Sequence, residues 1–130
     1  MPPEGFSIRR VRLPLAASAW STMGAMVGMR SRRLESLCGA PLAGITAAHI
    51  LGLVDAQVGE SFDLDFKQSL YPEPVNKRDL AGDVAAMANT AGGVIVLGVA
   101  DVQGRAVAAE GVALSDGEVR RMHQLIASGV

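Results

Sequence analysis

The apolar run Val94–Val99 constrains the fold of this chain more than any other feature. Its six residues, Val-Ile-Val-Leu-Gly-Val, leave no polar face. Such a run is typical of a strand that other elements cover on both faces. Turn-forming residues flank it, with Gly92-Gly93 before it and Asp101–Gly104 after it. The sequence therefore predicts a central strand of a sheet, with further strands and helices packed around it.

The segment Ser61–Lys67 is predicted to be a neighbouring strand, because its residues alternate between apolar and polar. Successive side chains of a strand point to opposite faces of the sheet. We therefore expect Phe62, Leu64 and Phe66 on the buried face and Asp63, Asp65 and Lys67 on the polar face. Arg105–Ala109 is predicted to be a strand on the other side of the central one.

Helical spacing and capping residues predict four helices. The expected helices are Arg32–Cys38, a second from Thr46 to Gly59, a third over 77–89, and a fourth opened by Ser115-Asp116-Gly117-Glu118. Leu80, Val84 and Met87 form the buried stripe of the third helix. Together with the strands, these helices predict an α+β fold with a mixed sheet.

Charge is distributed unevenly along the 130 residues. Residues 1–33 contain six Arg and one Glu, whereas residues 34–130 contain six Lys or Arg and twelve Asp or Glu. This indicates a basic arm on an acidic body, so the body is not a nucleic-acid binder on charge alone. The lone Cys38 cannot form an internal disulfide, which fits a cytoplasmic protein, and no apolar run is long enough to cross a membrane.

Residues 1–30 are expected to be a leader outside the folded domain, which would then span residues 31–130. Their low complexity in Ala, Gly, Met and Arg favours a mobile segment, or a translation start at Met23, Met26 or Met29. An export signal is the alternative, since Ala17-Ser18-Ala19 resembles a cleavage site. Pro14 and Ser18 interrupt the apolar stretch that such a signal needs.

Three acidic residues, Glu60, Asp65 and Asp101, are the candidates for chemistry. If they converge, their oxygens form a hard site that suits Mg²⁺ or Mn²⁺, which could activate water against a phosphodiester. Their Cα atoms would then lie within about 10 Å of one another, with Lys67 opening on the same cleft to hold a phosphate. The alternative is that these acids are ordinary solvated charges at strand edges.

Three sequence blocks resemble the Schlafen AlbA domain family, of the single-lobe type found in bacteria. They are Glu60-Ser-Phe-Asp-Leu-Asp-Phe-Lys67, Leu80-Ala-Gly-Asp-Val-Ala-Ala-Met-Ala-Asn-Thr-Ala-Gly-Gly93 and Val94–Asp101. The resemblance covers roughly residues 55–130. It implies an α+β domain that binds nucleic acid. In the animal Schlafen proteins the matching acids form a metal-dependent endoribonuclease site that acts on structured RNA such as tRNA.

Matched residue by residue, that site falls on Glu60, Asp65 and Asp101, which would be both catalytic and metal-binding. Asp65 stands where glutamate is commoner, and Ala100 stands where a second aspartate is common. Asn89, Thr90, Gly92 and Gly93 match a family turn, whose expected role here is structural. Many relatives continue beyond the point that matches Val130, so the chain would be a truncated domain or a lone module.

These observations leave three functions open. The first is a nucleic-acid-binding module, for RNA or DNA, with a regulatory or defence role. Its candidate contacts are Lys67, Lys77, Arg78 and Arg105. The second is an endoribonuclease that needs Mg²⁺ or Mn²⁺, and the third is a protein-interaction domain. A homodimer is expected by analogy with the paired lobes of animal Schlafens, and no phosphate-binding G-x-x-x-x-G-K-[ST] loop supports ATP hydrolysis.

Overall fold

Six strands and four α-helices succeed one another in the computed structural model, which describes residues 7–13, 22–28, 31–68, 76–88, 92–112 and 115–129. In chain order they are β1 (Ser7–Leu13), β2 (Thr22–Gly28), α1 (Arg32–Cys38), α2 (Ala47–Asp55), β3 (Leu64–Lys67), α3 (Asn76–Ala88), β4 (Val94–Leu97), β5 (Val99–Val102), β6 (Arg105–Ala109) and α4 (Asp116–Gly129). A single 3₁₀ turn, Leu42–Gly44, precedes α2. This is the α+β arrangement that the sequence predicts.

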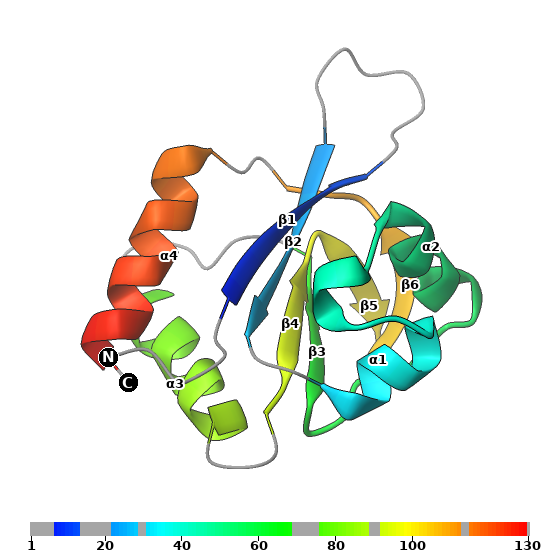
Figure 1. Ribbon diagram of the computed structural model, residues 1–130, viewed down its shortest axis with the longest axis horizontal. Coiled ribbons are helices and arrows are strands. Elements are labelled where there is room, and N and C mark those ends of the chain that lie inside the picture. The colour runs from blue at the N-terminus through cyan, green and yellow to red at the C-terminus, as the bar shows by residue number, and fades with distance from the viewer. Residues whose placement is uncertain are drawn as a thin grey trace.

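The main sheet has the strand order β1-β2-β4-β3 (Figure 1). β4 pairs antiparallel with β2 and parallel with β3, so the sheet is mixed as predicted. The parallel register sets Leu64 beside Val94 and Lys67 beside Leu97. β5 and β6 form a separate antiparallel hairpin.

Helices cover both faces of β4, which confirms the central buried strand. Val94 and Val96 pack in one apolar cluster with residues of α1 and α2, whereas Ile95 and Leu97 pack in another with residues of α3 and α4. Figure 1 shows α3 and α4 on one side of the sheet and α1 and α2 on the other. The second cluster contains the predicted stripe of α3, namely Leu80, Val84 and Met87.

Gly98 ends the central strand earlier than the sequence predicts. Its φ is +92°, its N–H donates to the Lys67 carbonyl at 2.7 Å, and a Cβ there would lie 2.8 Å from the Gly111 Cα. Only glycine fits such a bend readily. The chain therefore leaves the main sheet, and the prediction that Arg105–Ala109 flanks the central strand is wrong: β2 takes that place, while β6 pairs with β5.

The β5–β6 hairpin is attached to the residues that precede β3. The Ala106 N–H donates to the Val58 carbonyl at 2.9 Å, and the Glu60 N–H donates to the Gly104 carbonyl at 2.7 Å. This pairing requires α2 to end before the predicted Gly59. The helix ends at Asp55, and Gln57 takes a φ of +48° that turns the chain toward the hairpin.

The structure differs from the expectation that residues 1–30 lie outside the fold. β2 pairs with β4 from Ala25 opposite Leu97 to Gly28 opposite Val94, and Met26 and Val27 are buried. A strand between two others, covered on both faces, requires small and apolar residues. The composition that indicates low complexity therefore also suits an inner strand.

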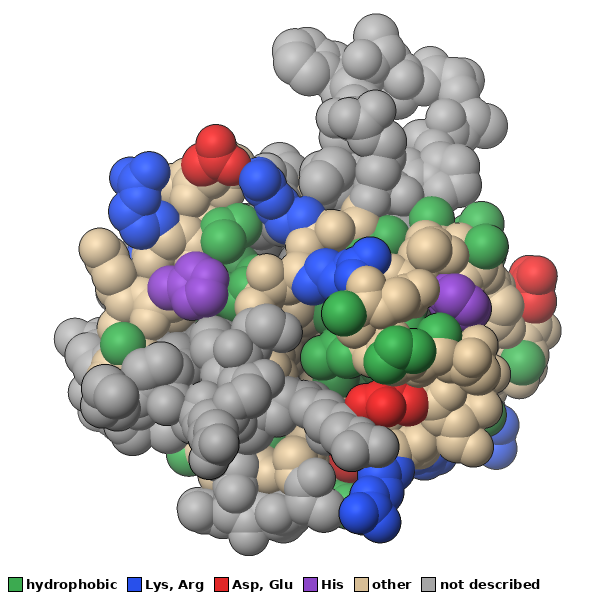
Figure 2. Space-filling view, in the orientation of Figure 1, with side chains coloured by type: hydrophobic (Ala, Val, Ile, Leu, Met, Phe, Trp, Pro, Cys, Tyr) green, Lys and Arg blue, Asp and Glu red, His purple; other side chains and the backbone are tan. Residues whose placement is uncertain are grey.

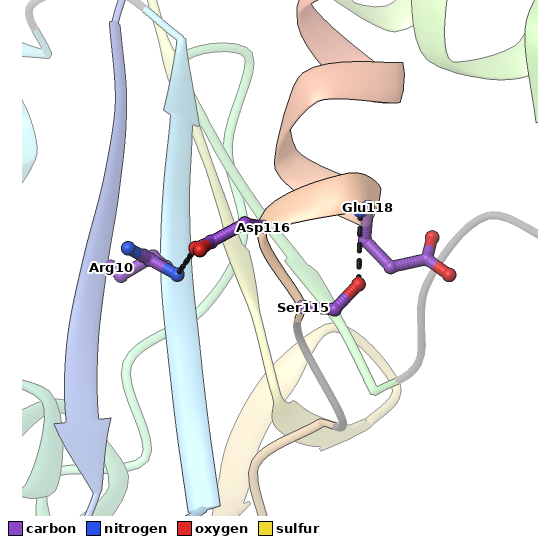
Figure 3. A network of polar contacts seen from close by, with 4 residues as sticks. All are labelled: Arg10, Ser115, Asp116 and Glu118. Carbon is purple, nitrogen blue, oxygen red and sulfur yellow. Dashed lines mark hydrogen bonds and ion pairs between the residues drawn. The ribbon is translucent and has the colours of Figure 1, made fainter.

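An ion pair joins the edge strand β1 to the start of α4. The Arg10 guanidinium lies 2.6 Å from the Asp116 carboxylate (Figure 3). The Ser115 hydroxyl accepts the Glu118 N–H at 3.1 Å, which confirms Ser115 as the helix cap. The Glu118 carboxylate pairs with Arg121. Among the described residues no helix has the length and apolar character that a membrane span needs.

A tight turn at the start of β3 overturns two burial predictions. Ser61 and Leu64 exchange backbone hydrogen bonds of 2.9 and 3.2 Å across Phe62 and Asp63. The regular alternation begins only at Leu64, so Leu64 and Phe66 are buried as predicted. Phe62, predicted to be buried, is 72% exposed, and Asp63, predicted to be exposed, is only 6% exposed.

Hydrogen bonds explain why Asp63 is buried. Its carboxylate oxygens accept from the Ser61 hydroxyl at 2.6 Å and from the Ser31 hydroxyl at 2.8 Å. Burial opposes ionisation, but these bonds and one from the Arg33 backbone outweigh it, and the pKa of Asp63 is lowered. Because Ser31 also caps α1 by accepting the Leu34 N–H, Asp63 ties this helix to β3.

The two phenylalanines of this segment provide a test of the turn. Phe66→Ala removes a buried ring and is expected to lower the free energy of unfolding by about 3–5 kcal/mol. Phe62→Ala removes an exposed ring and is expected to change it by less than about 0.5 kcal/mol. Urea denaturation of both variants measures the difference. Equal losses would mean that the regular alternation extends back to Ser61.

Candidate functional site

Glu60 lies between β3 and the β5–β6 hairpin. Its carboxylate oxygen Oε1 accepts the Phe66 N–H at 3.2 Å. A Cβ placed on Gly104 would be 3.7 Å from its other oxygen, Oε2. The Glu60 N–H also donates to the Gly104 carbonyl in the hairpin turn. β3 thus holds the carboxylate of Glu60, and the hairpin holds its backbone.

Asp65 and Lys67 occupy the face of β3 that is opposite to Leu64 and Phe66, as the sequence predicts. The Asp65 oxygen Oδ2 lies 3.4 Å from the Lys67 ammonium, and both side chains are partly exposed. In the register they stand beside Ile95 and Leu97, so they share the sheet face that α3 covers. A charged residue of α3 can therefore interact electrostatically with Asp65 and Lys67.

Asp101 is exposed and lies in β5, at an irregularity in the pairing with β6. Its oxygen Oδ2 accepts the Gly104 N–H at 3.0 Å and so stabilises the hairpin turn. Gly104 therefore bonds to Asp101 through its N–H and to Glu60 through its carbonyl. This glycine is the point at which the segment before β3 meets the turn after β5.

Asp65 and Asp101 both act electrostatically on Glu60. Burial raises the pKa of Glu60, and the Phe66 N–H partly offsets this effect. A hydrogen bond with the Asp65 carboxyl, together with the charges of Asp65 and Asp101, raises the pKa of Glu60 further. The fold thus places the predicted trio close enough for each charge to be felt at Glu60. Whether their Cα atoms fall within 10 Å of one another stays a prediction.

Asp83 is a fourth acid near this site that the sequence analysis does not identify. Burial alone would lower the pKa of Lys67, but the charges of Asp65, Asp83 and Glu60 outweigh it and raise that pKa. Asp83 lies on α3, far from β3 in sequence, and no spacing pattern connects the two. We refer to Glu60, Asp65, Asp83 and Asp101 as the acidic cluster.

The donor atoms of the acidic cluster suit a hard cation, but the described residues do not present a ready metal site. Carboxylate oxygens are the ligands that Mg²⁺ and Mn²⁺ prefer. No group of three or more His, Cys, Asp or Glu side chains in the described ranges could hold a metal ion. Protein donors already engage one oxygen each of Glu60, Asp65 and Asp101. The metal site stays a prediction.

The predicted basic contacts fall into two groups. Lys67 lies beside the acidic cluster. Arg105 is exposed at the start of β6, opposite Val102, and donates to the Gln57 carbonyl at 3.4 Å. Lys77 and Arg78 belong to the first turn of α3, and their side chains lie outside the described part.

The two glycines of the predicted turn lie where the chain comes close to α3. Gly92 has a φ of +98°, and a Cβ on Gly93 would lie 2.7 Å from the Met87 side chain. The two glycines therefore let the chain pass from α3 into β4 at close range. Asn89 and Thr90 lie outside the described residues.

The burial of Glu60, together with repulsion from Asp65 and Asp101, predicts a pH-dependent stability. Because the pKa of Glu60 is raised in the folded state, the folded chain binds this proton more tightly than the unfolded chain. Stability is therefore lost as the pH rises above the unfolded value of about 4.3. Glu60→Gln is expected to raise the melting temperature at pH 7, with the gain shrinking toward pH 4. Thermal unfolding followed by circular dichroism measures it.

The matched control is Glu118→Gln, because the Glu118 carboxylate pairs with Arg121. This variant is expected to show no gain in melting temperature at pH 7. An unchanged or lower melting temperature for Glu60→Gln at pH 7 would mean that burial and neighbouring charges do not destabilise the Glu60 carboxylate.

Comparison with known protein families identifies the chain. The model of the family described as "Schlafen, AlbA_2" matches residues 60–128, which is more than half of the chain. The match begins at Glu60 and includes Asp65, Lys67, Asp83, Asp101 and Arg105. No curated protein and no solved structure matches. The chain belongs to the Schlafen AlbA_2 family.

Proposed function

We propose that this chain is a nucleic-acid-binding module with a regulatory or defence role. The observation that carries the proposal is that Lys67 and Arg105 flank the acidic cluster within the segment that matches the Schlafen AlbA_2 family. Lysine and arginine side chains are the usual contacts to phosphate oxygens in such proteins.

The proposed grip on nucleic acid is local, because the described residues on the face drawn in Figure 2 form no broad basic patch. Figure 2 shows basic side chains of the described residues at separate places on one face, with acidic and apolar ones between them. Residues 34–130 carry twice as many acidic as basic residues. Binding that depends on a few phosphate contacts weakens with added salt in proportion to their number.

Fluorescence anisotropy with labelled RNA and duplex DNA, at several salt concentrations, tests the proposal. Lys67→Gln and Arg105→Gln are each expected to weaken binding and to reduce the slope of log affinity against log salt by about one. Arg120→Gln, at an exposed position of α4, is the matched control and is expected to leave both unchanged. Absence of binding at low salt would contradict the proposal and favour a protein-interaction domain.

A metal-dependent endoribonuclease is the second candidate, favoured by the effect of the Asp65 and Asp101 charges on Glu60. Incubation of tRNA with the protein and Mn²⁺, followed by gel electrophoresis, tests it. Cleavage that Asp65→Asn and Asp101→Asn abolish, with RNA binding retained, supports a nuclease. Equal cleavage by these variants, or none by the wild type, rejects it.

A homodimer, expected from the resemblance, would appear as twice the monomer mass in light scattering.

A further inference from the structure

Two exposed apolar side chains lie close in sequence to members of the acidic cluster. Phe62 is 72% exposed and Val102 is 61% exposed, and they are the two most exposed large apolar side chains in the described part of the chain. Phe62 follows Glu60 by two residues, and Val102 directly follows Asp101. The other exposed large apolar side chains in the described part are Leu37 on α1, Leu51 on α2 and Val107 on β6.

The turn that carries Phe62 is firmly anchored. Backbone hydrogen bonds between Ser61 and Leu64 close it, and the buried Asp63 carboxylate ties it to Ser61 and Ser31. The ring therefore cannot move into the core without breaking these bonds. A group that is held in place before binding loses little freedom when a ligand packs on it.

A backbone hydrogen bond joins the two segments that carry Phe62 and Val102. The Glu60 N–H bonds to the Gly104 carbonyl at 2.7 Å, and two residues of chain span at most about 7 Å on either side. Val102 stands opposite Arg105 in the hairpin register. An aromatic ring, an aliphatic side chain and a guanidinium thus come from the two joined segments that also carry Glu60 and Asp101.

We propose that Phe62 is a stacking platform for an unpaired nucleobase, with Val102 beside it and Arg105 contacting the phosphate backbone. This inference rests on the proposed function and specifies its ligand as single-stranded or unstacked nucleic acid. Aromatic side chains bind such strands because every free base has an open face. In a duplex the neighbouring base pairs cover these faces. Nearby carboxylates can also accept hydrogen bonds from the amino groups of bases.

A protein partner fits this surface less well than a base does. A specific protein–protein interface buries about 1,200–2,000 Å² in total and has a core depleted of charged residues. Here the two exposed apolar side chains are separate, and the segments that carry them also carry Glu60 and Asp101. A single base needs only one ring to stack on.

The experiment compares Phe62→Ala with the wild type on two probes. These are a fluorescein-labelled 12-nucleotide RNA without self-complementarity and the same RNA annealed to its complement, each in Ca²⁺ and again in EDTA. Fluorescence anisotropy is expected to show a 5- to 150-fold loss of affinity for the single strand. Duplex affinity is expected to change by less than about twofold. Phe62→Tyr should retain the affinity for the single strand, as should Leu37→Ala, the exposed apolar control on α1.

The possible failures are distinguishable. If the wild type binds RNA and Phe62→Ala binds the single strand equally well, the stacking platform is wrong but the proposed function stands. Equal losses on both probes would reject the preference for single strands. If the wild type binds neither probe, the proposed function fails and this inference fails with it. A dimer that dissociates on Phe62→Ala substitution, seen by light scattering, would assign the ring to a contact between copies.

Discussion

The parallel pairing of β3 with β4 is the constraint on which the rest of this structure depends. β4 is apolar on both faces, so it must lie inside the sheet, and β2 and β3 satisfy its two edges. The register begins where the Val94 N–H donates to the Asp63 carbonyl at 2.9 Å. From that point the alternation of β3 sends Leu64 and Phe66 into the core. It leaves Lys67 and Asp65, a member of the acidic cluster, on the opposite face.

The candidate site therefore depends on an anchor that is not itself part of it. Asp63 is buried because two hydroxyls and a backbone N–H stabilise its charge, and a buried carboxylate without such partners would be costly. Its hydrogen bonds close the turn that exposes Phe62 and hold the start of β3 against α1. On the other side, Gly104 joins the β5–β6 hairpin to Glu60. The two anchors together set the distance between β3 and Asp101.

Much of the fold follows from the sequence because local patterns decide it. The buried strand, the stripe of α3, and the ends of α1 at Ser31 and Gly39 depend on periodicity and capping. Three features depend on distant contacts, and no local pattern reveals them. They are the inner position of β2, the pairing of β4 with β2 where β6 is predicted, and the effect of the Asp83 charge on Lys67. The exposure of Phe62 and the burial of Asp63, which reverse the prediction, lie between these two groups. Ser61 before Asp63 is a turn signal, but the alternating pattern conceals it.

The central claim is that nucleic acid binds where β3, the turn before it and the β5–β6 hairpin meet. Amide chemical-shift mapping by NMR, with a short single-stranded RNA added to ¹⁵N-labelled protein, tests this claim most directly. The account predicts that the largest shifts fall on residues 60–67 and 101–105, while amides of α2 and α4 stay in place. Shifts concentrated instead on the arginines of β1, or absent at saturating RNA, would contradict it.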